Sequence, residues 1–155
     1  MTTNRQSSSL ALLIVVLGLL ACDPGFYYHP EGWKKRQGYE WTQRFDGIEL
    51  TTSGLSGFVG STGIIPDFDV TNTTDHIFVL QHAELLVEEN SYAANIADKE
   101  AKWRTVEPHS SRSLTIYWEF DDVAVDVLGE RPIAVLEFTV AGAARRIEIT
   151  FTRAE

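Results

Sequence analysis

Hydrophobic and polar residues alternate with a period of two along much of this chain. The alternation is clearest from Leu114 to Phe120, where every second residue is large and apolar and the residues between them are mostly polar. This pattern is typical of a β-strand with one buried face and one exposed face. It recurs at 136–140 and 147–151, on either side of the loop Ala-Gly-Ala-Ala at 141–144, and predicts a closing antiparallel hairpin.

Other segments extend the strand pattern toward the N-terminus, and only residues 91–101 have a helical pattern. Because parallel strands need long crossover connections, short strands without helices between them favour antiparallel pairing. We therefore predict an all-β fold, a two-sheet antiparallel immunoglobulin-like sandwich of seven or eight strands. The remaining strand candidates, each bounded by Gly, Pro, Asn or Asp, are 40–45, 47–53, 64–72, 76–88 and 102–106.

A different pattern precedes the strands. Residues 10–21 form an uncharged apolar run, which follows a polar segment with one positive charge at Arg5. A helix of this length rises only about 18 Å, against about 30 Å for the hydrocarbon core of a membrane. The run therefore predicts a cleaved signal helix and not a permanent span. Because it is apolar all round, it does not suit a surface helix of the folded domain.

The apolar run ends in Leu19-Leu20-Ala21-Cys22, which resembles the bacterial lipobox. In that family the cysteine thiol receives diacylglycerol and the leader is cut before the cysteine. The resemblance implies a protein of the cell envelope that is held on the membrane by lipid on Cys22 and faces the periplasm or the exterior. Two or three acyl chains hold a protein stably, since one chain is marginal. Ordinary secretion and a retained anchor are the alternatives, and the choice between inner and outer membrane stays open.

These patterns divide the chain into a signal peptide at 1–21, a lipid anchor and tether at 22–38 and a β-sandwich domain at 39–155. The tether mixes Pro, Gly and aromatic residues without a strand or helix period. Its aromatic residues either contact the membrane interface or pack on the domain. We favour packing, because the three basic residues at 34–36 are fewer than lipid-binding clusters usually have.

Two stretches of the domain resemble immunoglobulin-like domains of bacterial envelope lipoproteins. Asp67-Phe-Asp-Val-Thr-Asn72-Thr corresponds to a strand that ends in Val-x-Asn before a turn. Residues 77–87 follow, and Val106-Glu-Pro-His-Ser-Ser-Arg-Ser-Leu114 then corresponds to a Val-x-Pro-x-x-Ser turn that leads into a strand. The resemblance spans residues 67–114 and supports the fold more than any function.

Composition and charge narrow the possible chemistry. The single cysteine excludes an internal disulfide and any site with two thiolate ligands, and Met1 is the only methionine. Removing the leader, which carries Arg5 and no acidic residue, leaves 12 basic and 22 acidic side chains, a net charge of −10. Such a surface disfavours nucleic acid as a partner. Glycines at 54, 57, 60 and 63 lack the lysine of a phosphate loop, so no nucleotide cofactor is expected.

Two groups of side chains are candidates for chemistry. His82 and Glu84 share a strand face and suit an acid-base or metal pair, although a hydrogen-bonded surface pair is the favoured interpretation. His76 lies too far along the same strand to join them. Acidic residues in loops could pool oxygen ligands for calcium, but no Asp-x-Asp-x-Asp-Gly loop is present and solvated loops are favoured. The candidate metal residues are Asp121, Asp122 and Asp126, with Asp67 and Asp69 on another strand.

The patterns together predict a non-catalytic, membrane-anchored envelope lipoprotein that acts as a binding, assembly or scaffolding module. Its partners would be the membrane, through lipid on Cys22, and an envelope protein that the sequence does not identify. A calcium-dependent binding domain is the alternative, and an enzyme that uses His82 and Glu84 is a third hypothesis. No cofactor is expected.

Overall fold

The computed structural model describes residues 25–32, 41–58, 63–94, 96, 104–114, 116–119 and 128–154. All regular structure in these residues is β, so the all-β prediction is confirmed for this part of the chain. None of the described residues forms a helix long and apolar enough to cross a membrane. The strands are β1 (Gly25–Pro30), β2 (Trp41–Phe45), β3 (Ile48–Phe58), β4 (Gly63–Asn72), β5 (Phe78–Val87), β6 (Asn90–Ala93), β7 (Thr105–Val106), β8 (Ser110–Leu114), β9 (Trp118–Glu119), β10 (Ile133–Val140) and β11 (Ala143–Arg153).

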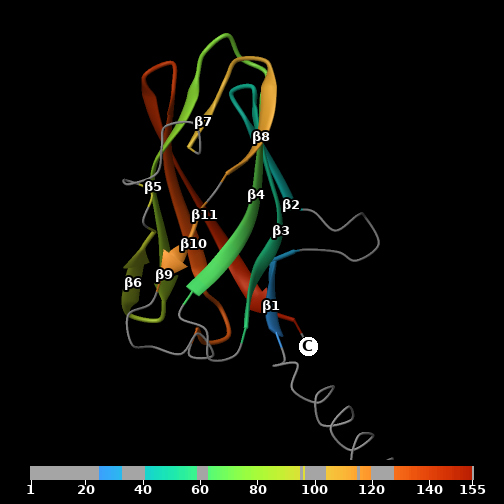
Figure 1. The fold of residues 1–155 in the computed structure, drawn as a ribbon, viewed down its shortest axis with the longest axis vertical. Helices are drawn as coiled ribbons and strands as arrows, with labels where there is room; N and C mark the ends of the chain where they lie inside the picture. Colours follow the sequence, from blue (N-terminus) through green and yellow to red (C-terminus); the bar gives the residue numbers. More distant parts are fainter. Residues whose placement is uncertain are drawn as a thin grey trace, which may run out of the picture.

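The strands form one antiparallel sheet in the order β6-β5-β10-β11-β1-β3-β4-β8, and β2 pairs with β3, β7 with β5 and β9 with β4. The sheet is curled (Figure 1). Only the turn at 107–109 separates β7 from β8, yet β7 pairs with β5 and β8 pairs with β4, on opposite sides of the strand order. The described residues thus form one curled sheet, and two separate sheets of an immunoglobulin-like sandwich are not confirmed.

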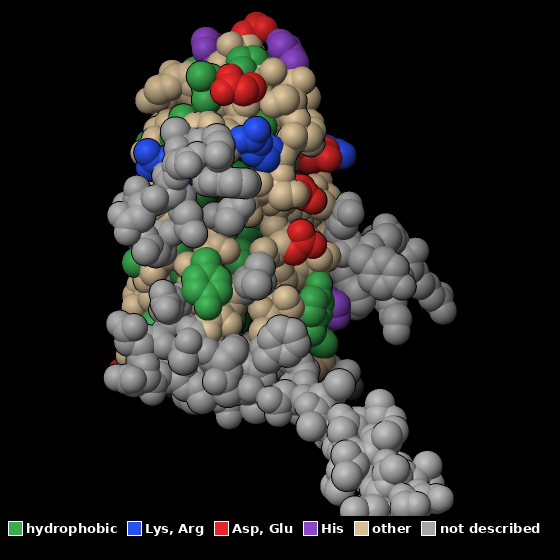
Figure 2. Space-filling model, viewed as in Figure 1, with side chains coloured by type: hydrophobic (Ala, Val, Ile, Leu, Met, Phe, Trp, Pro, Cys, Tyr) green, Lys and Arg blue, Asp and Glu red, His purple; other side chains and the backbone are tan. Residues whose placement is uncertain are grey.

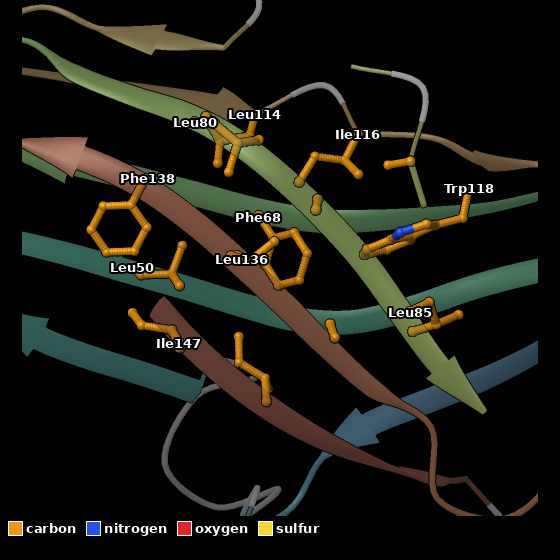
Figure 3. Close-up of a cluster of buried hydrophobic side chains, with 14 of the residues drawn as sticks. Leu50, Phe68, Leu80, Leu85, Leu114, Ile116, Trp118, Leu136, Phe138 and Ile147 are labelled. Carbon is orange, nitrogen blue, oxygen red and sulfur yellow. The ribbon is translucent and has the colours of Figure 1, made fainter. Parts of the chain in front are cut away.

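The concave side of the curled sheet holds the hydrophobic core. Leu50 of β3 and Phe68 of β4 lie across from Leu136 and Phe138 of β10 (Figure 3), and all four side chains are buried. Trp118 is fully buried, and its ring centroid lies 6.4 Å from that of Phe68 in an edge-to-face arrangement. Each large apolar side chain buried in this way contributes roughly 1.5–3 kcal/mol, so the core is the main source of stability.

The closing hairpin of β10 and β11 is confirmed, with a tighter turn than the four-residue loop that the sequence predicts. Val140 pairs with Ala143, and Ala141 and Gly142 both have positive φ angles, 53° and 76°. Two such residues define a type I′ turn, whose twist matches that of the strands. The β2–β3 hairpin uses the same turn at Asp46-Gly47 (φ 45° and 78°), where Asp-Gly is a favoured dipeptide.

The strand predicted from Leu114 to Phe120 is interrupted in the structure. Leu114 ends β8 opposite Phe68, and Trp118 begins β9 opposite Ile64, with the same register on both sides of the gap. Pro66 of β4 lies opposite the interruption and has no N–H to donate to a neighbouring strand. The predicted alternation of burial holds for the described residues, since positions 114, 116 and 118 are buried and Tyr117 is exposed.

Two segments differ from the sequence-based prediction. Residues 91–93, expected to be helical, belong to β6, which pairs with β5. Residues 25–30, expected in the tether, form β1, which pairs with β11 on one side and with β3 on the other. The folded domain therefore extends to the N-terminal side of residue 39. The sequence did not indicate β1 because Gly-Phe-Tyr-Tyr-His-Pro does not alternate between polar and apolar residues.

Tyr28 fixes β1 to the rest of the domain. Its side chain is buried, with 1% exposed, and its hydroxyl donates a hydrogen bond of 2.8 Å to the carbonyl oxygen of Gly129. Burial raises the pKa of the Tyr28 phenol above its usual value of 10.0, and the positive charge of Arg153 opposes this shift. The expectation that aromatic residues of 23–38 pack on the domain holds for this residue.

Candidate functional site

Four of the residues that the sequence singles out lie outside the described part of the chain. These are the predicted lipidation site, Cys22, and the candidate calcium ligands Asp121, Asp122 and Asp126. Their roles stay predictions.

Asp67 and Asp69, the other candidate acidic ligands, lie on the exposed face of β4. Each carboxylate accepts a hydrogen bond from a serine hydroxyl, Ser53 for Asp67 and Ser113 for Asp69. Within the described residues, no group of three or more His, Cys, Asp or Glu side chains is placed to hold a metal ion. These two aspartates thus form hydroxyl–carboxylate pairs on the sheet, and the calcium alternative depends on residues outside the described ranges.

His82 and Glu84 lie side by side on the outer face of β5, as predicted. The Nε2 atom of His82 is 3.8 Å from Oε2 of Glu84, and the same oxygen accepts a hydrogen bond of 2.8 Å from the Ser91 hydroxyl. The side chain of His82 is 41% exposed. This is an ion pair when the imidazole is protonated, and a partly exposed pair of this kind contributes little to stability. His76 is not on this strand, because it lies in the turn before β5.

Several turns lie together at the end of the domain that is farthest from Gly25, the first residue of β1. We call this end the upper end. It comprises the turns at 46–47, 73–77, 107–109 and 141–142 (top of Figure 1). The turn at 73–77 contacts two of the others. The amide and hydroxyl of Thr73 donate to the carbonyl oxygen of Gly47 at 2.8 and 2.7 Å. Asp75 accepts a hydrogen-bond contact of 2.9 Å from Nε2 of His109, in the turn before β8.

Asn72, the last residue of β4, holds two of these turns in place. Its side chain is fully buried, and its Nδ2 atom donates to the carbonyl oxygens of His76, Val106 and Glu107 at 2.7, 3.1 and 3.2 Å. Its Oδ1 atom accepts from the amide and the hydroxyl of Thr74 at 3.0 and 2.8 Å. One side chain is therefore hydrogen-bonded to both the Val-x-Asn turn and the Val-x-Pro turn that the sequence singles out.

A cleft of about 190 Å³ lies at the upper end, between the β2–β3 turn, the 73–77 turn and the β10–β11 hairpin. An ion pair lies beside it: Nε and Nη2 of Arg145 donate to Oδ2 of Asp46 at 3.0 and 2.8 Å. Phe45, at its base, packs on Phe138 with ring centroids 5.1 Å apart. The lining combines apolar residues (Phe45, Val140, Ala141, Ala143) with polar ones (Asp46, Thr74, His76, Arg145).

The surface around the cleft carries further groups for recognition. Ile77 is 46% exposed and lies between His76 and the start of β5. Histidine side chains flank an acidic side chain at the upper end (Figure 2), where Asp75, His76 and His109 are all exposed. Apolar, acidic and imidazole groups thus lie within one small area.

The size of the cleft limits what it can hold. Pockets for small molecules and cofactors usually measure about 300–1,000 Å³, so this cleft by itself is small for a cofactor and has room for one or two side chains of a protein partner. A second hollow of about 350 Å³ shares Phe45 and Asp46 with it. The cleft's apolar base and charged rim match the anatomy of protein interfaces.

Sequence patterns alone did not identify this cleft. The Asp46-Gly47 dipeptide signals a hairpin turn, but nothing local shows that Arg145 lies beside it. Comparison with protein-family models, curated proteins and solved structures finds no match to this chain.

Proposed function

We propose that this protein is an exported lipoprotein, anchored through lipid on Cys22, whose β domain is a non-catalytic binding module for another component of the cell envelope. The observation that carries the proposal is Leu19-Leu20-Ala21-Cys22 at the end of the apolar run 10–21. Lipid is transferred to the thiol of a cysteine in the substrate protein, and Cys22 is the single cysteine of this sequence.

The upper end supports the binding role. Its cleft has the volume of one or two side chains, an apolar base at Phe45 and a charge pair between Asp46 and Arg145. Asn72 holds the 73–77 turn on one side of the cleft, and Thr73 ties that turn to Gly47, so these two turns should lose little conformational freedom when a partner binds. We therefore assign the partner-binding surface to this cleft and to the neighbouring Ile77.

We also propose that the domain is a variant of the immunoglobulin-like sandwich. Side chains of β3 and β4 meet those of β5 and β10 across the core, which supports two facing layers. A turn follows Asn72 and another, at 107–109, follows Val106, and these two turns also support the proposed variant. In this variant β1 joins the two layers into one continuous sheet.

The lipid anchor is tested by labelling cells with a palmitate analogue. The wild-type chain should take up label and be processed before Cys22, whereas Cys22→Ser should show neither. A matched control carries Cys22→Ser together with Ser111→Cys, which keeps one cysteine but places it on exposed β8. Label on that control, or on Cys22→Ser, would show that the lipobox does not direct acylation.

The binding role is tested by in-cell crosslinking and mass spectrometry with two neighbouring arginines. Arg145 lines the cleft, whereas Arg146 points to Glu137 and Glu148 on the outer face at 3.4 and 3.0 Å. Their side chains are similarly exposed, at 47% and 50%. Arg145→Ala should lose a recurrent crosslinked partner that Arg146→Ala keeps. Equal recovery by both variants would exclude the cleft as the binding surface.

A further inference from the structure

The start of β1 lies very close in sequence to the proposed lipidation site. Gly25 is the first residue of the strand, and only Asp23 and Pro24 separate it from Cys22. Three residue steps of fully extended chain span at most about 11 Å. If Cys22 carries lipid at the membrane surface, Gly25 is therefore held within about 11 Å of that surface.

Strand β1 cannot easily detach to lengthen this connection. Residues 28–30 pair with β11 and residues 25–28 pair with β3, so the strand is held on both sides. Tyr28 is buried and hydrogen-bonded to Gly129. The backbone also approaches β3 closely, since a Cβ atom built on Gly54 would lie 2.2 Å from the carbonyl oxygen of Tyr28. Releasing β1 would expose core and break two strand pairings.

The pairing of β1 also sets its direction. Gly25 lies opposite Phe58, the last residue of β3, so β1 begins at the end of the domain that also carries the C-terminal end of β11 (Figure 1). We call this the lower end. Strand β3 begins at Ile48, beside the Asp46-Gly47 turn of the upper end, and ends at Phe58, at the lower end. Its ten residue steps of about 3.3 Å place the lower and upper ends about 33 Å apart.

Neither outer face of the sheet suits contact with a membrane. The outer face of β4 carries Asp67 and Asp69. That of β5, β10 and β11 carries Glu84, Glu137 and Glu148, and Arg146 pairs with the last two, so carboxylates outnumber the arginine on this face. Carboxylates are repelled by anionic lipid and are costly to desolvate. A domain lying on its side would place one of these acidic faces against the headgroups, whereas a domain standing on its lower end avoids both.

We infer that the acylated protein stands on the bilayer with its lower end against the lipid headgroups and its upper end, with the cleft, facing away. This inference rests on the proposed lipidation of Cys22. The short Asp23-Pro24 connection and the fixed β1 set the orientation, so the cleft meets partners about 33 Å or more from the membrane surface and not partners embedded in the same headgroup layer.

The test uses two exposed glutamates at opposite ends of the full-length acylated protein. Glu89 lies in the β5–β6 turn at the lower end, and Glu107 lies in the β7–β8 turn at the upper end. Each is replaced by cysteine in turn and labelled with a fluorophore, since acylation leaves Cys22 without a free thiol. The protein is placed in phosphatidylcholine vesicles that carry a headgroup-linked acceptor dye.

Energy transfer should remove most of the fluorescence at Glu89→Cys and little at Glu107→Cys. A Gly-Ser linker of about 20 residues inserted before Gly25, with an average span of about 25 Å, should reduce the difference between the two positions. Equal transfer at both positions, or stronger transfer at 107, in protein shown to be acylated would overturn the orientation alone. Recovery of unacylated protein would overturn the lipid anchor and the orientation with it.

Discussion

At the scale of single residues, Asn72 shows how one buried polar group can organise a surface. Its amide nitrogen faces three carbonyl oxygens and its oxygen faces two donors, so each polar atom of the side chain is satisfied. The sequence identifies Asn72 as a turn residue. Its contacts with Val106 and Glu107, more than 30 residues away, are visible only in the folded chain.

Replacing Asn72 with aspartate should destabilise the protein by about 3 kcal/mol. The change removes the N–H donors and places a carboxylate against three carbonyl oxygens in a buried site. The free energy of unfolding in urea measures the effect. Asn90→Asp, at an exposed position of β6, is the matched control and should stay within about 0.5 kcal/mol of wild type. Similar losses in the two variants would contradict the role assigned to Asn72.

The raised pKa of Tyr28 predicts that the stability of the protein depends on pH in the alkaline range. Because burial raises its pKa in the folded state, the unfolded chain ionises first, near its ordinary value of 10.0. The stability that the neutral phenol contributes is therefore complete below about pH 10 and is lost as the pH rises through the folded-state pKa. Tyr28→Phe, which loses the hydrogen bond to Gly129, should be less stable by about 1 kcal/mol at pH 7.

The difference in free energy of unfolding between wild type and Tyr28→Phe should become smaller as the pH rises above 10, because phenylalanine does not ionise. Urea unfolding of both proteins at pH 7 and at several alkaline values measures this difference. A difference that stays constant across the range would mean that Tyr28 ionises equally easily in the folded and unfolded states.

At the scale of elements, β1 depends on a close approach to β3. Gly54 has a φ angle of 155° and lies at an irregularity in the β3–β4 pairing. A Cβ atom there would lie 2.2 Å from the carbonyl oxygen of Tyr28 and 2.8 Å from the ring of Tyr27. The sequence shows glycines every three residues in this region, but only the structure shows which of them a neighbouring strand requires.

Gly54→Ala should lower the free energy of unfolding by about 2–3 kcal/mol, because backbone and ring atoms must shift to make room. Hydrogen exchange of the β1 amides should also become faster as the strand separates from β3. Gly142→Ala is the control, since it also has a positive φ angle but no atoms within 4 Å of the added Cβ. It should cost only the backbone strain, about 1 kcal/mol, and leave exchange in β1 unchanged. Slow β1 exchange in both variants would contradict the steric argument.

At the scale of the whole molecule, β1 joins two groups of strands. Among the described residues, no other strand pairs with both groups. On one side lie β11, β10 and β5, and on the other β3, β4 and β8. The domain boundary at residue 39, which the sequence predicts, would remove this strand. Burial of Tyr28 and the pairing on both sides of β1 would be lost with it.

A chain of residues 39–155 should therefore unfold at a clearly lower denaturant concentration than a chain of residues 23–155, or lose cooperative unfolding altogether. Burial of the Tyr28 side chain alone accounts for roughly 1.5–3 kcal/mol. Far-ultraviolet circular dichroism during urea titration compares the two chains. The same midpoint for both would show that β1 is dispensable for the fold.

The sequence by itself determined the all-β class, the closing hairpin and the positions of most strands. These features depend on alternation and turn residues within a few positions of one another, which a linear pattern records. The tertiary structure decided the place of β1, the continuity of the curled sheet and the cleft. These depend on contacts such as Tyr28 with Gly129 and Asp46 with Arg145, about 100 residues apart, which no local pattern encodes.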